Sequence, residues 1–159
     1  LSKKIVGRLV KALEGMGTEF RFNTSLGKEV DLDSLKESYD NIFIAIGDWG
    51  QRKLGIPGEE MLISGLDFLV GVNKESRAKP GEKVLVIGGG NVAIDAARTA
   101  LRLGADSVEI CYRRSRKEMP ANEEEIREAI EEGITIRYLL SPVETLGRNG
   151  VLSGVKMVA

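Results

Sequence analysis

The sequence contains no histidine and a single cysteine, Cys111. Without histidine the chain lacks the usual general base and every Ser-His or Cys-His nucleophile pair, so acid–base hydrolysis is not the expected chemistry. With one cysteine it cannot form an internal disulfide, build most kinds of zinc site or hold an iron–sulfur cluster alone. Such sparing use of cysteine fits a reducing cytoplasm, which is the expected compartment.

An excess of charge of either sign is also lacking. The 23 Lys and Arg residues face 24 Asp and Glu residues, for a net charge of −1. No overall positive field therefore favours nucleic acid or an anionic membrane. No apolar run approaches the roughly 18–20 residues of a membrane span, and no secretory signal opens the sequence. We expect neither a nucleic-acid partner nor a membrane span.

A polar stretch over residues 73–82, which contains Pro80-Gly81, is the clearest boundary in the sequence. Before it, apolar spacing predicts three helices and two strands. The helices are expected over 3–14, over 34–38 with Asp33 as the cap, and over 66–72, and the strands over 19–23 and 41–46.

After the boundary, hydrophobic patterning predicts a β-α-β-α-β order over 83–140. The strands are expected over 83–87, 107–112 and 134–140, with one helix over 91–103 and another that begins near Pro120 and ends at Gly133. Asn149-Gly150 between two apolar runs predicts a β-hairpin. The predicted class is α/β, a three-layer Rossmann-like nucleotide-binding domain with an appended antiparallel hairpin.

A glycine-rich turn lies between the first predicted strand and helix of this unit, with G-x-G-x-x-A spacing at Gly88, Gly90 and Ala93. Such turns let the backbone approach a pyrophosphate, which then meets the free N–H groups and partial positive charge of a helix start. The alternative is a structural turn without a ligand. The strand–turn–helix context favours the ligand site, and the candidate cofactor-binding residues are Gly88, Gly89, Gly90, Asn91, Val92 and Ala93.

The end of the next strand indicates which dinucleotide would bind. An NAD site usually has an acidic residue about 20 residues further on, bonded to the ribose 2′-hydroxyl. Here that place holds a basic segment with Arg113, Arg114, Arg116 and Lys117. Guanidinium groups suit a 2′-phosphate, so NADPH is the predicted cofactor. The alternative is a solvated basic loop balanced by nearby glutamates.

Two stretches in combination resemble a known family. One is Tyr39-Asp40-Asn41-Ile42-Phe43-Ile44-Ala45-Ile46-Gly47, followed by Leu54-Gly55-Ile56-Pro57-Gly58-Glu59. The other runs from Val86 through Gly88-Gly89-Gly90-Asn91-Val92-Ala93 to Arg98, followed by Tyr112-Arg113-Arg114-Ser115-Arg116-Lys117-Glu118-Met119-Pro120. They resemble the small subunit of NADPH-dependent glutamate synthase and related flavin oxidoreductases of the pyridine nucleotide-disulfide oxidoreductase superfamily.

The resemblance implies that an NADPH domain interrupts an FAD domain. Residues 1–72 would then be a remnant of the split FAD domain with its connecting segment, 73–82 a linker and 83–159 the NADPH-binding domain. Gly47 would lie near the flavin, beside Asp48 and Trp49. The implied activity passes hydride from NADPH to FAD, and electrons on to iron–sulfur clusters in a partner domain or subunit.

The flavin fingerprint of that family is absent, so we expect the chain to be a fragment that retains no FAD and is inactive alone. Its partners would be the missing FAD domain and an iron–sulfur domain or subunit. The alternative function is a non-catalytic NADP(H)-sensing domain, which would not need the segment from Tyr39 to Gly47. A complete small-substrate dehydrogenase is less suitable, because no catalytic Tyr-Lys, Cys or zinc site is found.

Overall fold

The computed structural model describes residues 3–47, 50, 53–74 and 80–159. The chain divides into two compact units, residues 1–47 and residues 48–159, and each is described by itself. The division falls before the boundary expected over 73–82, so residues 53–74 belong to the second unit. Part of that predicted linker, residues 75–79, lies outside the described residues, as do Asp48 and Trp49.

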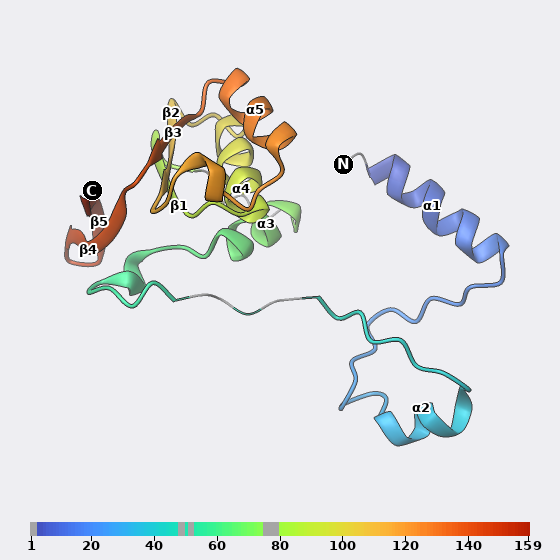
Figure 1. Cartoon of the computed structure of the whole chain (residues 1–159). Coiled ribbons are helices and arrows are strands. Elements are labelled where there is room, and N and C mark those ends of the chain that lie inside the picture. The colour runs from blue at the N-terminus through green and yellow to red at the C-terminus, as the bar shows by residue number, and fades with distance from the viewer. Residues whose placement is uncertain (1–2, 48–49, 51–52, 75–79) are drawn as a thin grey trace. The chain divides into compact units, whose positions relative to one another are not determined.

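The second unit is built on a three-stranded parallel sheet (Figure 1). Its strands are β1 (Lys83–Ile87), β2 (Ser107–Tyr112) and β3 (Thr135–Tyr138), in the order β1-β2-β3. Helix α4 (Asn91–Arg102) connects β1 to β2, and α5 (Glu123–Glu131) connects β2 to β3. The β-α-β-α-β order expected from the sequence is therefore confirmed.

Alternation along the strands places the core between the sheet and its helices. Val108, Ile110 and Tyr112 of β2 are buried and belong to one hydrophobic cluster with Ile94 of α4 and Ile126 of α5. Every second side chain of a strand points to the same face, so this face of β2 is the one that the helices cover. The buried face of α4 is small apart from Ile94, with Ala93, Ala96, Ala97 and Ala100. Small side chains allow a helix to lie close to a sheet.

An ion-pair network joins α4 to α5. The Arg98 guanidinium donates to Glu132 Oε1 at 2.6 Å and lies 2.8 Å from Glu128 Oε2, while Arg102 donates to the same Glu132 oxygen at 2.6 Å. These hydrogen bonds, first from Arg98 and then from Arg102, lower the pKa of Glu132 below its ordinary value. The Arg98 side chain is only 17% exposed, so this is a partly buried ion pair that holds α4 and α5 together.

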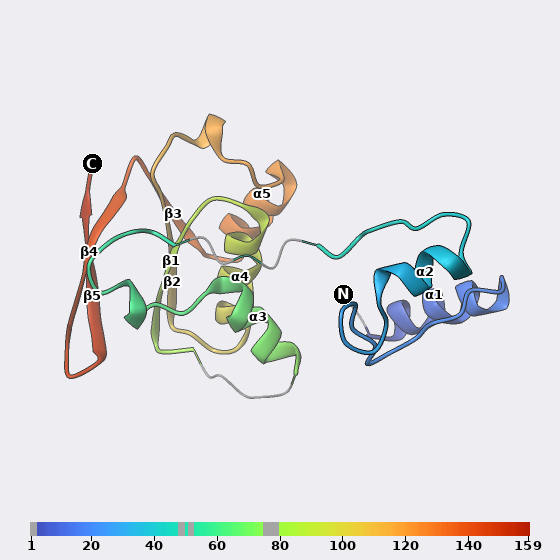
Figure 2. The same cartoon turned by 90° about the horizontal axis from the view of Figure 1, so that it is seen from below.

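A hairpin of β4 (Ser141–Arg148) and β5 (Val151–Val158) follows β3 as expected. Asn149 has φ 52° and Gly150 has φ 75°. Positive φ at both central residues is the signature of a type I′ turn, whose twist suits two-residue hairpins. In both views the hairpin lies on one side of the parallel sheet and α4 and α5 lie on the other (Figures 1 and 2). The three-layer arrangement is thus helices, parallel sheet and hairpin.

The segment before β1 packs on the hairpin and on the helix layer. A short 3-10 helix, η1 (Glu59–Met61), contacts β4, and α3 (Gly65–Asn73) contacts α4. Thr145 of β4 donates both its N–H, at 3.1 Å, and its hydroxyl, at 3.2 Å, to the carbonyl oxygen of Pro57. These bonds explain why the stretch from Leu54 to Glu59 belongs to the second unit, which the sequence did not reveal.

The first unit contains α1 (Lys3–Gly15) and α2 (Leu32–Ser38). The cap of α2 is Asp31 rather than the predicted Asp33. The Asp31 carboxylate accepts from Ser34 N at 2.8 Å, and this bond lowers its pKa. Both residues can cap by type, but the residue three before Ser34 reaches its N–H.

Three other expectations were wrong in detail. The strands predicted over 19–23 and 41–46 do not form, and the described part of the first unit has only an isolated bridge between Leu26 and Val30. A strand needs a neighbouring strand and a covering layer, yet Phe43 is 92% exposed. Helix α5 begins at Glu123 and not near Pro120, because the side chain of Asn122 caps it by accepting from Glu124 N.

Candidate functional site

The glycine loop lies at the carboxyl ends of β1 and β2, as the sequence predicted. Ile87 pairs with Cys111 in the parallel register, and Gly88 N donates to Cys111 O at 3.0 Å. Gly88 has φ 144°, a backbone conformation that favours glycine. A Cβ built on it would be in ordinary contact with that of Ala93, at 3.5 Å, so the small side chain at position 93 lets α4 start close to the strand. The loop thus delivers the start of α4 to the edge where ligands of open parallel sheets bind.

Gly90 leaves open space at the start of α4. It is the N-cap residue, has no side chain to cap the helix, and a Cβ built on it meets nothing within 4 Å. The backbone N–H groups of Asn91 and Val92 have no acceptor among the described residues. This combination of a vacant surface and unsatisfied helix N–H groups is what an anionic pyrophosphate requires.

Gly89 is glycine for a different reason. A Cβ at this position would come within 2.5 Å of the Tyr112 ring. Tyr112, at the end of β2, is 8% exposed, and its hydroxyl donates to the carbonyl oxygen of Glu118 at 2.8 Å. The ring therefore supports the glycine loop from below while its hydroxyl holds the basic segment that follows β2. The residue pattern alone did not show this double role of Tyr112.

The basic segment is folded by its own side chains. The Glu118 carboxylate accepts from the backbone N–H of Ser115 at 3.2 Å and from its hydroxyl at 3.0 Å, which forms a capping box around Arg116–Glu118. These two hydrogen bonds, with a smaller effect of the Arg114 charge, lower the pKa of Glu118. Arg116 pairs with Glu123 at 3.2 Å. Its charge is therefore partly used within the protein.

Three cations of this segment form no ion pair within the described part of the chain, and Lys117 is one of them. Arg113 and Arg114 are the other two; both are exposed, and neither side chain forms a hydrogen bond there. They follow Tyr112 directly, at the strand end next to the glycine loop. The structure thus brings two unpaired guanidinium groups to the edge that holds the start of α4.

Asn91 has a contact that the sequence did not predict. Its side-chain oxygen accepts from Asn122 N at 3.1 Å. Beside this bond, Ala121 N donates to the carbonyl oxygen of Gly89 at 3.1 Å. Ala121 and Asn122, at the end of the loop that contains the basic segment, are in this way bonded to the glycine loop. No spacing rule would have shown this, because the two partners lie about thirty positions apart and one of them is a backbone group.

The remaining candidates lie elsewhere. Gly47 ends the first unit, so it is not placed relative to the glycine loop. Cys111 is 4% exposed, and burial is the main cause that raises the pKa of its thiol, as expected of a packed residue.

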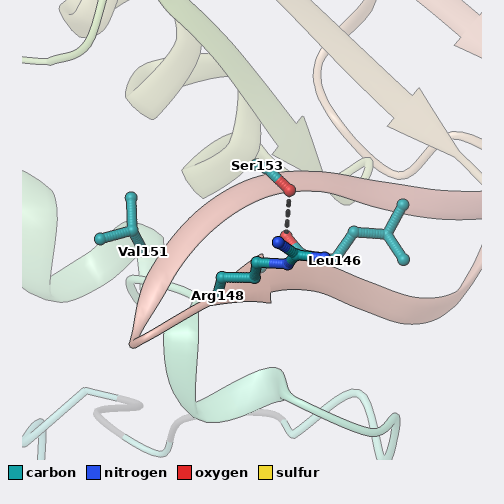
Figure 3. A pocket seen from close by; sticks show the side chains of 5 residues that line it. Leu146, Arg148, Val151 and Ser153 are labelled. Carbon is teal, nitrogen blue, oxygen red and sulfur yellow. Dashed lines mark hydrogen bonds between the residues drawn. The ribbon is translucent and has the colours of Figure 1, made fainter.

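Within the described ranges, no group of side chains could hold a metal ion, and no helix is both long and apolar enough to cross a bilayer. A shallow pocket lies in the hairpin, lined by Leu146, Gly147, Arg148, Val151 and Ser153 (Figure 3). The Ser153 hydroxyl donates to Leu146 O at 3.0 Å across the two strands. That bond satisfies its polar group internally, and the pocket has no part in the glycine loop.

Comparisons with known proteins find a family model and curated relatives that match nearly the whole chain. The family model described as pyridine nucleotide-disulphide oxidoreductase matches residues 3–156. The chain is 36% identical over 173 residues to the glutamate synthase [NADPH] small chain of Escherichia coli. The aligned region covers 99% of this chain and 36% of that protein. It is 37% identical over 163 residues to the NADP(+)-dependent formate dehydrogenase subunit beta of Moorella thermoacetica, covering 99% and 23%. The chain thus spans about a quarter to a third of the length of these relatives.

Solved structures show the same fold. The FprA protein of Mycobacterium tuberculosis in complex with NADPH superposes with a TM-score of 0.69 at 21% identity, covering 96% of this chain and 54% of that one. The thioredoxin reductase of Lactococcus lactis gives a TM-score of 0.55 at 28% identity, covering 68% and 35%. With the family model matched over nearly all of its length, the chain belongs to the pyridine nucleotide-disulphide oxidoreductase family.

Proposed function

We propose that this chain is the NADPH-binding portion of an FAD-dependent oxidoreductase of the glutamate synthase small-chain kind. One observation carries the proposal. An open helix start at Gly90 lies at the same sheet edge as two exposed guanidinium groups, Arg113 and Arg114, that form no hydrogen bond or ion pair within the described part of the chain. The first feature fits a pyrophosphate and the second fits the 2′-phosphate that distinguishes NADPH from NADH.

The glycine loop would hold the pyrophosphate with backbone groups. The N–H groups of Asn91 and Val92 are available as donors, and Gly90 contributes the vacant surface. The positive end of α4 adds a favourable interaction with the phosphate charge. Gly88 and Ala93 act indirectly: Gly88 supplies the positive φ of the turn, and the small side chain of Ala93 permits the close approach of helix and strand. Gly89 serves the loop by lying on Tyr112.

The basic segment would hold the 2′-phosphate with Arg113 and Arg114. Arg116 is the weaker candidate of the three arginines first considered, because Glu123 already neutralises part of its charge. A guanidinium offers planar paired donors that match a phosphate, and it does so without a change of protonation. Because Arg113 and Arg114 directly follow Tyr112, their guanidinium groups must lie near the end of β2.

The names of the relatives support NADP(H) and a partner subunit. The Escherichia coli, Moorella and Geobacter sulfurreducens relatives are named as NADPH- or NADP(+)-dependent, and each is named as a small chain or a subunit beta. We infer that the whole enzyme likewise combines this unit with an FAD domain and with an iron–sulfur domain or subunit. We further expect it to act in the cytoplasm.

The bound nicotinamide and flavin rings would supply the hydride chemistry. The residues of this chain bind and orient the nicotinamide cofactor, and Gly47 of the first unit is proposed to lie near the flavin. We expect the chain alone to bind NADPH without retaining FAD and to be inactive without its partner domains. Purified protein with a flavin absorption band would contradict the expectation about FAD.

The proposal is tested by titrating the protein with NADPH and with NADH, followed by calorimetry. The expected result is tighter binding of NADPH, and a loss of about 10-fold to 100-fold in NADPH affinity in the double variant Arg113→Ala/Arg114→Ala. Hydrogen bonds between charged groups are each worth about 1.5–3 kcal/mol, of which solvent exposure removes a part. Affinity for NADH should change by less than about 2-fold, a difference of a few tenths of a kcal/mol.

Arg127→Ala is the matched control. Arg127 is an exposed arginine of α5 that pairs with Glu124 and Glu131 at 3.5 and 3.8 Å. Its removal should leave both affinities unchanged. Equal binding of the two nucleotides by the unaltered protein, or tighter binding of NADH, would overturn the assignment of the arginines. Failure to bind either nucleotide would overturn the assignment of the glycine loop as well.

A further inference from the structure

We propose that Asn91 is a positioning residue that sets the preference for NADPH over NADH through its bond to Asn122. The inference rests on the proposed function and goes beyond it. The sequence motif placed Asn91 among the residues that touch the cofactor. The structure instead gives its side-chain oxygen to a backbone N–H at the far end of the basic segment.

The basic segment is fixed at both ends. At one end it leaves β2 directly after Tyr112, whose ring lies under Gly89. At the other end, Ala121 N donates to Gly89 O and Asn122 N donates to the Asn91 side chain, both at 3.1 Å. A segment closed in this way has fewer conformations than a free loop of the same length.

The middle of the segment is held to its own backbone. The Tyr112 hydroxyl donates to Glu118 O, and the Glu118 carboxylate accepts two hydrogen bonds from Ser115. Arg113 and Arg114 thus lie in a closed loop but keep their guanidinium groups exposed. The preorganised loop lowers the entropy lost when these groups bind a phosphate.

Asn91 joins this loop to the pyrophosphate site. It is the first residue of α4, and its backbone N–H lies in the open helix start. Its side chain therefore fixes the distance between the place for the pyrophosphate and the place for the 2′-phosphate. NADPH occupies both places, whereas NADH needs only the first. Loss of the side-chain bond should weaken NADPH more than NADH, which a purely structural role would not do.

The required chemistry is an acceptor oxygen, since Asn122 contributes an N–H. Asn91→Ala removes the acceptor. Asn91→Asp keeps it, but adds a negative charge next to the anionic pyrophosphate, which weakens both nucleotides alike. The two variants therefore separate the positioning role from general damage to the site. Asn73→Ala is the matched control, because the Asn73 side chain also makes a single backbone hydrogen bond, to Leu69 O at 2.9 Å on α3.

The experiment measures the dissociation constants of NADPH and NADH for the full chain and the three variants, with thermal unfolding of each. Asn91→Ala should lower the NADPH-to-NADH preference by about 5-fold to 10-fold, the value of one hydrogen bond of roughly 1 kcal/mol. Asn91→Asp should weaken both nucleotides and keep the preference within about 2-fold of the unaltered protein. Asn73→Ala should keep both affinities.

Two results would overturn the inference while leaving the proposed function intact. One is an unchanged preference in Asn91→Ala, whatever its melting temperature. The other is a preference lost equally in Asn91→Asp, which decides the matter even where the alanine variant does not fold. If the unaltered protein shows no preference for NADPH, the proposed function fails, and the inference fails with it.

Discussion

The ring of Tyr112 lies so close beneath Gly89 that a Cβ added to the glycine would come within 2.5 Å of it. The next residue, Gly90, has nothing within 4 Å of the same position. Two neighbouring glycines of one motif are therefore glycine for opposite reasons. Gly89 makes room for the Tyr112 ring, whereas Gly90 faces open space, which we propose a ligand fills.

This difference predicts that alanine at position 89 lowers stability, whereas alanine at position 90 blocks binding and leaves the stability nearly unchanged. Gly89→Ala should lower the free energy of unfolding by about 1–3 kcal/mol, because the Tyr112 ring must move out of the core. Gly90→Ala should change it by less than about 0.5 kcal/mol, since the added methyl group meets no atom of the protein. Urea unfolding measures both. Calorimetry should show loss of NADPH binding in Gly90→Ala despite its intact fold. Full binding by that variant would contradict the assigned pyrophosphate site.

The Arg98–Glu132 pair predicts how stability depends on pH. The pKa of Glu132 is lowered in the folded state from its ordinary value of 4.5. Between these two values the unfolded chain carries a proton that the folded chain does not. The stabilisation by this carboxylate is therefore fully present above about pH 4.5 and is lost as the pH falls through the lower folded value.

Glu132→Gln should consequently be less stable than the unaltered protein at neutral pH, and the difference should shrink as the pH falls below 4.5. Thermal unfolding across this pH range measures the difference. Glu131→Gln is the control, since Glu131 is 68% exposed and lies 3.8 Å from its partner. A stability difference for Glu132→Gln that stays constant down to acidic pH would show that the carboxylate charge has no part in joining α4 to α5.

The contact between Gly58 and Thr145 predicts a coupled pair. A Cβ on Gly58 would collide with the Thr145 hydroxyl, and the glycine has φ 77°. Gly58→Ala should therefore lower the free energy of unfolding by about 2–4 kcal/mol, from overpacking and from the left-handed backbone together. Adding Thr145→Ala removes the colliding atom, so it should reduce the cost of Gly58→Ala but not abolish it. A double-mutant cycle measured by urea unfolding gives the coupling. Strictly additive effects would mean that η1 does not pack on the hairpin.

Much of the second unit followed from local patterns in the sequence. The apolar runs at β1 and β2, the helix between them and Asn149-Gly150 each carry a strong local signal, and each formed where expected. The apolar run over 41–46 carries an equally strong signal and forms no strand. Its apolar pattern is typical of a buried strand, but these residues are exposed in the structure, and a strand forms only where a second strand offers backbone partners.

The candidate site was predicted in outline but not in its connections. The glycine spacing and the arginine cluster identified the sheet edge that the structure confirms as their common location. Three hydrogen bonds make these connections: Asn122 to Asn91, Ala121 to Gly89 and Tyr112 to Glu118. Each involves a backbone group, and the first two join residues that are distant in the sequence. Side-chain type does not encode such partners, so only the folded structure shows that the basic segment is bonded to the glycine loop.

The most direct test of the central claim is a titration of the isotope-labelled protein with NADPH, followed by the backbone amide signals in NMR. The largest shifts are expected at Gly90, Asn91 and Val92 and at Arg113 and Arg114. NADH should move the first group and leave the two arginines nearly unchanged. Saturable binding that shifts the hairpin signals instead, with those of the glycine loop unchanged, would show that NADPH does not bind at the start of α4.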